Sequence, residues 1–298
     1  MPAARPARLL ILRGGALGDF LVTLPVLTAL RARWPDGYLE LVGYPHYAEL
    51  ARAAGLVDRV TSLHGARIAR LYALDAQLPD DLVTWIRSFD FILTFLHDPE
   101  GVVQDNLKRA GARTVLYTTP LVTRSHAVDH LLKPLESLAI YAAGAAPRLI
   151  LPPGEPARTP PYAVLHPGSG SARKNAPLEI FLRLARALEQ DRGWTPIFLT
   201  GEADEAVADA LARPGAPGTH LANRPLPEVA HLLNHAAAYA GNDSGITHLA
   251  AALGIPTLAL FGPSDPEQWG PRGARVRIVS APGGDWSLLP DDLSALIP

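Results

Sequence analysis

The chain has 298 residues, of which 48% are hydrophobic and 19% charged, and its formal net charge is −2. This length predicts two domains of ordinary size, and the near-neutral charge gives no indication of general binding to nucleic acids or other polyanions. Because the chain contains no cysteine, disulfides and thiolate metal sites are excluded.

The first half of the chain alternates short apolar runs with amphipathic segments. The apolar run at residues 9–12 is too short for a signal peptide, and no stretch approaches the length of a membrane span. We therefore expect a cytoplasmic protein with at most peripheral contact at the inner face of the cytoplasmic membrane. We expect strands at residues 9–12, 38–42, 60–63, 91–96 and 113–117, and helices at 20–34, 46–54, 102–110 and 124–143. This alternation predicts a parallel sheet with helices on both faces.

A glycine-rich loop, GGALGD, joins the first strand to the first helix. Its glycines lack the spacing of G-x-G-x-x-G, and Glu40 falls inside the next strand, so a nicotinamide site is disfavoured. Asp19 ends the loop at the carboxyl edge of the sheet, where α/β folds bind ligands. A cap for the following helix explains the same residue equally well, and both interpretations stay open.

A basic segment follows the third expected strand. It holds Arg59, His64, Arg67 and Arg70. Such a segment is most often a solvated helix face, and an acidic ligand is the alternative.

Prolines and glycines mark a boundary near the middle of the chain. We expect an N-terminal Rossmann-like domain at 1–146, a Pro-rich linker at 147–161 and a C-terminal Rossmann-like domain at 162–298. The second domain repeats the pattern, with strands at 162–166, 195–200, 237–240 and 257–261 and helices at 177–190, after 201–205 and from 246. A final short helix at 287–297 is expected to pack on the first domain.

Two loops of the second domain have the chemistry of a diphosphate site. After the strand at 162–166, Ser169, Gly170 and Ser171 offer N–H groups and hydroxyls, and Lys174 adds a positive charge. The spacing is not that of a Walker A motif, and an exposed Arg–Lys pair is the alternative.

The second loop, GNDSGITH, turns a buried strand into a helix N-terminus that suits an anion. Capping the helix needs only one of Asp243 and His248, and both are present in its first turns. This favours a ligand site over a purely structural turn. Because its carboxylate repels phosphate, we expect Asp243 to cap the helix or hold sugar hydroxyls, and His248 to reach a phosphate or the sugar. Glu202 or Glu205, after the strand at 195–200, is placed to accept hydrogen bonds from a ribose.

The chain resembles glycosyltransferase family 9, whose best-known members are the bacterial lipopolysaccharide heptosyltransferases. The resemblance lies in three blocks that match in order and spacing: LLILRGGALGDFLVTLPVLTALRARWP, LHPGSGSARKNAPLEIFLRLARAL and GNDSGITHLAAALGIPTLALFGPSDPEQWGP. It implies an α/β chain of GT-B type, with two doubly wound Rossmann-like domains and a cleft between them. The family's aromatic before the proline is Ala176 here, which leaves the donor contacts in doubt.

The resemblance also implies roles for individual residues. Asp19, in a GD-(five residues)-P motif that Pro25 completes, is implied as general base, and Lys174 as the diphosphate-binding lysine. The implied donor-binding set is Ser169, Gly170, Ser171, Asp243, Ser244, Gly245, Ile246, Thr247 and His248. Glu205, with Glu202 as the alternative, is implied for the ribose. The implied acceptor-binding set is Gly15, Gly18, Arg67, Arg70 and Arg124.

These features predict an inverting glycosyltransferase that needs no metal or other cofactor. Its partners would be a nucleotide-diphospho-sugar and a glycan or lipid-linked glycan acceptor, with no nucleic acid. The family implies heptose, an ADP-linked donor and a lipopolysaccharide-core acceptor, none of which the residues identify. The sequence contains no D-x-D and no His, Asp and Glu set at metal-ligand spacing. A GT-B sugar-nucleotide epimerase and a non-catalytic nucleotide-binding component of glycan assembly remain the alternatives.

Overall fold

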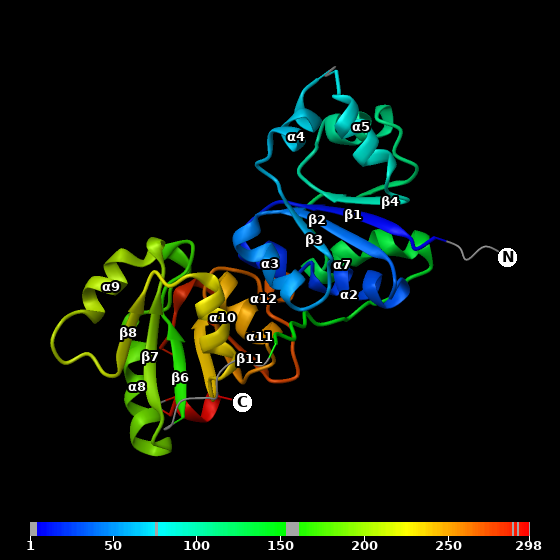
Figure 1. Cartoon of the computed structure of the whole chain (residues 1–298). Coiled ribbons are helices and arrows are strands. Elements are labelled where there is room, and N and C mark those ends of the chain that lie inside the picture. The colour runs from blue at the N-terminus through cyan, green and yellow to red at the C-terminus, as the bar shows by residue number, and fades with distance from the viewer. Residues whose placement is uncertain (1–4, 75–76, 153–160, 288, 291, 298) are drawn as a thin grey trace. The chain divides into compact units, whose positions relative to one another are not determined.

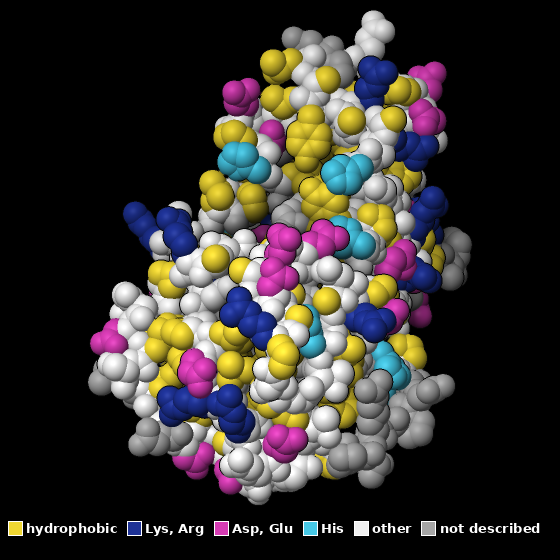
Figure 2. All heavy atoms as spheres, turned by 90° about the vertical axis from the view of Figure 1, so that its left-hand side faces the viewer, with side chains coloured by type: hydrophobic (Ala, Val, Ile, Leu, Met, Phe, Trp, Pro, Cys, Tyr) yellow, Lys and Arg dark blue, Asp and Glu magenta, His cyan; other side chains and the backbone are white. Residues whose placement is uncertain are grey.

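The chain folds into two compact units, Met1–Ala145 and Ala146–Pro298, each built around its own parallel sheet (Figure 1). The computed structural model describes residues 5–74, 77–152, 161–287, 289–290 and 292–297. Part of the expected linker, residues 153–160, lies outside these. Within the described ranges, no helix combines the length and apolarity needed to cross a bilayer. Lysine, arginine and acidic side chains are interspersed over the face shown in Figure 2.

The sheet of the first unit has the strand order β3-β2-β1-β4-β5. Its strands are β1 (Arg8–Arg13), β2 (Tyr38–Gly43), β3 (Arg59–Ser62), β4 (Phe91–Phe95) and β5 (Val115–Tyr117). All neighbours pair in parallel, and β1 is fully buried at residues 9–12. A strand covered on both faces is expected to be continuously apolar, as this one is. The strand order reverses between β1 and β4, where doubly wound sheets open a crevice at their carboxyl ends.

Helices cover both faces of this sheet, with α4 and α5 on one side and α2, α3 and α7 on the other (Figure 1). The α-helices are α1 (Leu17–Leu21), α2 (Leu24–Arg33), α3 (Pro45–Ala53), α4 (Ala66–Ala69), α5 (Asp80–Arg87), α6 (Val102–Arg109) and α7 (Ala127–Leu132). Two 3₁₀ turns follow α4 and α7, namely η1 (Arg70–Tyr72) and η2 (Lys133–Leu138). The sequence patterns did not identify α5.

Two helices expected from the sequence are shorter or broken in the structure. The helix expected at 20–34 divides into α1 and α2: α1 ends at Leu21 with Val22 as its C-cap, and α2 begins after its N-cap Thr23 with Pro25 in its first turn. Proline suits that position, since it has no N–H to leave unpaired. The helix expected at 124–143 is α7 followed by η2, and the chain leaves η2 at Ala139 with a φ of 55°.

The sheet of the second unit has the order β11-β10-β9-β6-β7-β8 and reverses between β6 and β9. Its strands are β6 (Tyr162–His166), β7 (Thr195–Thr200), β8 (Thr219–Ala222), β9 (Ala238–Asn242), β10 (Thr257–Phe261) and β11 (Val276–Ser280). Its α-helices are α8 (Leu178–Arg192), α9 (Glu205–Leu211), α10 (Leu226–Asn234), α11 (Gly245–Ala252) and α12 (Pro266–Trp269). Its 3₁₀ turns are η3 (Ala172–Lys174), η4 (Glu202–Asp204), η5 (Pro282–Gly284) and η6 (Ser294–Leu296). The sequence patterns missed the edge strands β8 and β11, which are only partly buried.

The C-terminal segment packs on the core of its own unit. Leu293 and Ile297 are buried together with apolar residues of α8, β6 and β9. Arg192 of α8 donates from Nη2 to the carbonyl of Ser294 at 3.0 Å. Among the described residues of 287–297, the helical segment is η6, and Leu293 and Ile297 complete the core of the second unit. That this segment also packs on the first domain stays a prediction.

Candidate functional site

Two loops of the second unit meet where the strand order reverses between β6 and β9. Lys174, at the end of the loop after β6, donates from Nζ to Oδ2 of Asp243, which follows β9, at 2.8 Å. The side chain of Asp243 is only 8% exposed, whereas that of Lys174 is 42% exposed. A buried carboxylate thus holds a cation that faces solvent at the crevice of this sheet.

Asp243 does not cap α11, contrary to one expectation from the sequence. Ser244 is the N-cap, and its Oγ accepts from the amide of Thr247 at 3.3 Å. Among the described residues, the amides of Ser244, Gly245 and Ile246 have no acceptor. These half-buried N–H groups stand at the positive end of the helix dipole, next to the Lys174–Asp243 pair.

Asn242 holds both ends of the loop after β6. It is fully buried at the end of β9; Nδ2 donates to the carbonyl of Pro167 at 2.8 Å, and Oδ1 accepts from the amide of Ala176 at 2.9 Å. A buried amide that uses both its donor and its acceptor fixes the loop that carries Lys174. The sequence patterns identified Asn242 only as a turn residue.

Asp204 joins this loop to the one after β7. Its carboxylate, 5% exposed, accepts from the amide of Ser169 at 3.0 Å and from that of Gly201 at 2.8 Å. A Cβ on Gly168 would lie 2.0 Å from the carboxylate, so only glycine fits there. Sequence reasoning missed Asp204, although it stands between the two glutamates that were considered for the ribose.

The two donors of Ser169 and the amide of Ser171 are used within the protein in this structure, and the role of both residues toward a diphosphate stays a prediction. The amide of Ser169 is bound to Asp204, and its hydroxyl lies 2.6 Å from Oδ1 of Asn175. The amide of Ser171 donates to that hydroxyl at 3.2 Å. These groups shape the loop, and the exposed residue between them is Gly170.

Thr247 and His248 are buried rather than presented to solvent. Thr247 is fully buried, and its hydroxyl bonds to the carbonyl of Asn242 and lies 2.9 Å from the hydroxyl of Tyr239. His248 is 6% exposed. Thr247 therefore stabilises the turn between β9 and α11. By contrast, Glu202 and Glu205 are exposed beside η4, at the carboxyl edge after β7.

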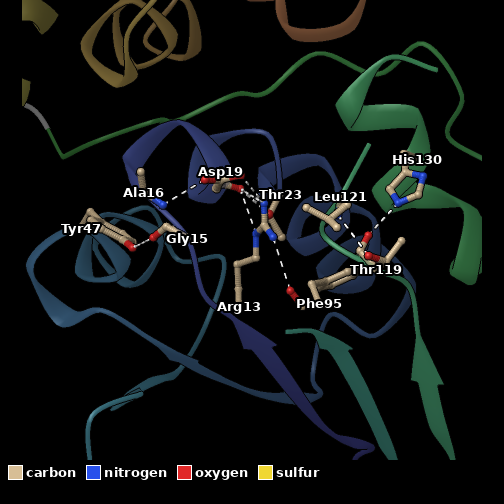
Figure 3. A network of polar contacts seen from close by, with 10 residues as sticks. All are labelled: Arg13, Gly15, Ala16, Asp19, Thr23, Tyr47, Phe95, Thr119, Leu121 and His130. Atoms are coloured by element: carbon tan, nitrogen blue, oxygen red, sulfur yellow. Dashed lines mark hydrogen bonds and ion pairs between the residues drawn. The ribbon is translucent and has the colours of Figure 1, made fainter. Parts of the chain in front are cut away.

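In the first unit, the reversal of strand order between β1 and β4 holds an Arg13–Asp19 network (Figure 3). Arg13, 3% exposed, donates from Nε and Nη2 to the carbonyl of Asp19 at 3.0 and 2.8 Å, and from Nη2 to Oδ1 at 3.1 Å. Burial lowers the pKa of Arg13, and Asp19 counteracts that effect. The guanidinium group of arginine is not deprotonated in proteins, so Arg13 keeps its charge and its ion pair with Asp19. Sequence reasoning missed Arg13, whose only signal is a charged residue directly after the apolar run at 9–12.

Asp19 has both properties that the sequence left open. Its Oδ2 accepts from the amide of Ala16 at 3.0 Å, so it satisfies an N-terminal donor of α1 from the third helical position. Its side chain is also 31% exposed at the carboxyl edge of the sheet. Gly15 has a φ of 94°, and a Cβ there would lie 2.7 Å from Oδ2 of Asp19. Gly18 lies inside α1 rather than in the loop.

The arginines predicted to bind the acceptor differ in their surroundings. Arg67, in α4, donates from Nη2 to Oδ2 of Asp81 at 2.6 Å, and both side chains are largely exposed. Arg70 and Arg124 are exposed. Exposed ion pairs are weak, so Arg67 remains available to an anionic ligand. In the part of the chain that the structure describes, His, Asp and Glu side chains form no group of three or more suited to a metal ion.

Comparisons with known proteins identify the same family as the sequence blocks. Residues 141–286 match the model of glycosyltransferase family 9 (heptosyltransferase). Lipopolysaccharide heptosyltransferase 1 of Pseudomonas aeruginosa is 27% identical, over 95% of this chain and 85% of its own length. Lipopolysaccharide heptosyltransferase 3 of Escherichia coli is 25% identical, over 85% of this chain and 82% of its own. The structure of the E. coli heptosyltransferase WaaC with ADP superimposes with a TM-score of 0.72 at 22% identity, covering 95% of this chain and 96% of the other.

Proposed function

Because this chain belongs to glycosyltransferase family 9, we propose that it transfers a heptose from ADP-heptose to a lipopolysaccharide-core acceptor with inversion at the anomeric carbon. That it is a glycosyltransferase of GT-B fold follows from the family and the two parallel sheets. The names of its relatives support the heptose, and the ADP in WaaC supports the nucleotide.

The observation that carries this proposal is the Lys174–Asp243 pair beside the open N-terminus of α11. When the bond between the sugar and the diphosphate breaks, negative charge develops on the departing phosphate. Lys174 is positioned to take that charge, and the amides of Gly245 and Ile246 add donors. Once the diphosphate attracts Lys174, Asp243 can accept hydrogen bonds from sugar hydroxyls.

Asp19 is the proposed base for the acceptor hydroxyl. It lies at the crevice of the first sheet, where α/β folds bind their ligands. Arg13 and the amide of Ala16 fix its carboxylate, leaving part of it open to solvent. A positioned carboxylate is what removal of a hydroxyl proton during transfer requires. Glu205 and Glu202 are proposed to accept from the ribose hydroxyls of the donor.

Calorimetry on Lys174→Ala tests the donor site directly. We expect ADP binding to weaken by about 1.5–3 kcal/mol, the scale of a hydrogen bond to a charged group. Adenosine, which has no phosphate, is expected to lose little affinity. Arg173→Ala is the matched control, since it removes the adjacent exposed cation. Equal losses for ADP and adenosine, or equal effects of the two variants, would remove Lys174 from the phosphate site.

A further inference from the structure

A cluster of aromatic rings lies beside the Asp19 loop in the first unit and has no role in the function proposed so far. The Tyr44 cluster consists of Tyr44, His46, Tyr47 and His64. Tyr44 and His46 follow β2, and His64 follows β3, so they gather at the carboxyl edge of the sheet. Asp19 follows β1 at the same edge. The cluster is therefore next to the proposed base in the order of the strands.

The rings of the Tyr44 cluster contact one another. The centroid of Tyr44 lies 4.9 Å from that of His64 and 5.7 Å from that of Tyr47, and His46 lies 4.4 Å from Tyr47. These distances fall within the range of favourable aromatic pairs. The rings thus hold one another in place.

Tyr47 connects the cluster to the Asp19 loop. It is 5% exposed, its hydroxyl donates to the carbonyl of Gly15, and its ring lies 5.3 Å from that of Phe20. Burial raises the pKa of Tyr47, as do Tyr44 and Asp19 nearby, so its hydroxyl remains a donor at neutral pH. Tyr47 is a buried support that fixes the cluster relative to Asp19.

The other members of the cluster are open to solvent. Tyr44 is half-buried, and His46 and His64 are exposed. Figure 2 shows histidine and hydrophobic side chains next to one another on the upper part of the face it presents. Rings that served only the core would be covered, as Tyr47 is. Tyr44 and His64 instead combine a supported position with an accessible surface.

This combination fits a pyranose ring better than a phosphate group. The C–H face of a pyranose is apolar and packs on an aromatic face, while its hydroxyls bond to polar atoms at ring edges. Tyrosine and histidine supply both kinds of contact. Recognition of a phosphate or carboxylate would instead call for arginine or lysine, and the four members of the Tyr44 cluster include neither.

We propose that Tyr44 and His64 bind a pyranose ring of the acceptor and thereby position its hydroxyl for Asp19. This inference rests on the proposed glycosyl transfer and names a contact for its acceptor. Tyr44 is a positioning residue, because the pyranose it holds need not be the one that reacts.

The test measures transfer from ADP-heptose to deacylated lipopolysaccharide-core oligosaccharides that end at successive sugars. For Tyr44→Ala we expect the acceptor KM to rise roughly 3- to 10-fold, the scale of one aromatic contact, with kcat and ADP affinity nearly unchanged. Tyr44→Phe keeps the ring face and loses only the hydroxyl, so its KM should rise less than that of Tyr44→Ala. Tyr141→Ala is the matched control, since Tyr141 is 77% exposed and outside the cluster. Thermal melting shows whether each variant is folded.

Saturation-transfer NMR with the same oligosaccharides separates failure of the inference from failure of the proposed function. Sugar ring protons should receive saturation from aromatic protons of the wild type and lose it in Tyr44→Ala. If the wild type transfers heptose but Tyr44→Ala has an unchanged KM and an unchanged spectrum, the inference is wrong and the function stands. If no oligosaccharide is glycosylated, the function is wrong. If none of them receives saturation from the wild type, the Tyr44 site is wrong as well.

Discussion

Asp19 combines a structural bond and a proposed chemical role in one carboxylate, so the choice of substitution decides what is measured. Alanine would remove the acceptor for the amide of Ala16 and leave the buried Arg13 without its ion pair. Asparagine keeps an oxygen for Ala16 and removes the charge that a base needs.

For Asp19→Asn we expect kcat to fall by about 10²- to 10⁴-fold, the usual contribution of a positioned base, with little change in ADP affinity. Turnover assays and calorimetry measure the two quantities. Asp36→Asn, at an exposed position of the same unit, is the control. An Asp19→Asn enzyme with wild-type kcat would show that Asp19 only stabilises the start of α1.

His166 makes the stability of the second unit depend on pH. It is 5% exposed at the end of β6, and its Nδ1 lies 2.9 Å from the carbonyl of Leu199. Burial lowers the pKa of His166 below its ordinary value, against smaller opposing effects of Leu199 and Asp204. Below about pH 6.5, His166 is therefore protonated in the unfolded chain while it stays neutral in the folded chain. The contribution of His166 to stability is present above that pH and is lost as the pH falls.

Urea unfolding between pH 8 and pH 5 checks this sign. We expect the free energy of unfolding of the wild type to decrease toward pH 5, and His166→Gln to show a shallower decrease. His231→Gln, at an exposed histidine, should keep the wild-type slope. A His166→Gln slope equal to that of the wild type would mean that other groups cause the acid sensitivity.

At the scale of elements, the site of the second unit depends on contacts between loops that are distant in the sequence. Asp204 bonds across from the loop after β7 to Ser169, and Asn242 bonds across from β9 to Pro167 and Ala176. Lys174 lies between those contacts. The position of its ammonium group is thus determined by three adjacent strands rather than by its own loop alone.

Gly168→Ala tests this arrangement, because the new methyl group would overlap the Asp204 carboxylate. We expect a loss of about 1–3 kcal/mol in the free energy of unfolding, as for overpacking, together with weaker ADP binding. Gly170→Ala is the matched control, since a Cβ there has no atom within 4 Å. Equal stability of the two variants would show that the loop can move away from Asp204 at little cost.

At the scale of the whole molecule, we propose that Lys174 and the amides of α11 stabilise the negative charge on the departing diphosphate without a metal ion. We therefore expect transfer to continue at the wild-type rate in EDTA. The measurement is turnover before and after chelation, followed by addition of magnesium, manganese or iron. Activity that is lost on chelation and restored by one of these ions would overturn the metal-free proposal.

The order of strands and helices could be predicted from the sequence because it depends on the local pattern of apolar and polar residues. Apolar runs such as residues 9–12 and 257–261, separated by amphipathic segments, indicate buried parallel strands and covering helices. The glycine-rich loop before Asp19 and the turn before α11 were identified for the same reason. Expectations failed where local signals were weak, as at the partly exposed edge strands β8 and β11.

The sequence by itself thus determined the α/β architecture and the loops that carry Asp19, Lys174 and Asp243. Only the tertiary structure decided which polar groups of these loops form hydrogen bonds within the protein. It paired Lys174 with Asp243, 69 positions apart, and Ser169 with Asp204, 35 positions apart. Hydrogen bonds over such separations depend on which strands lie side by side, and no local pattern records that.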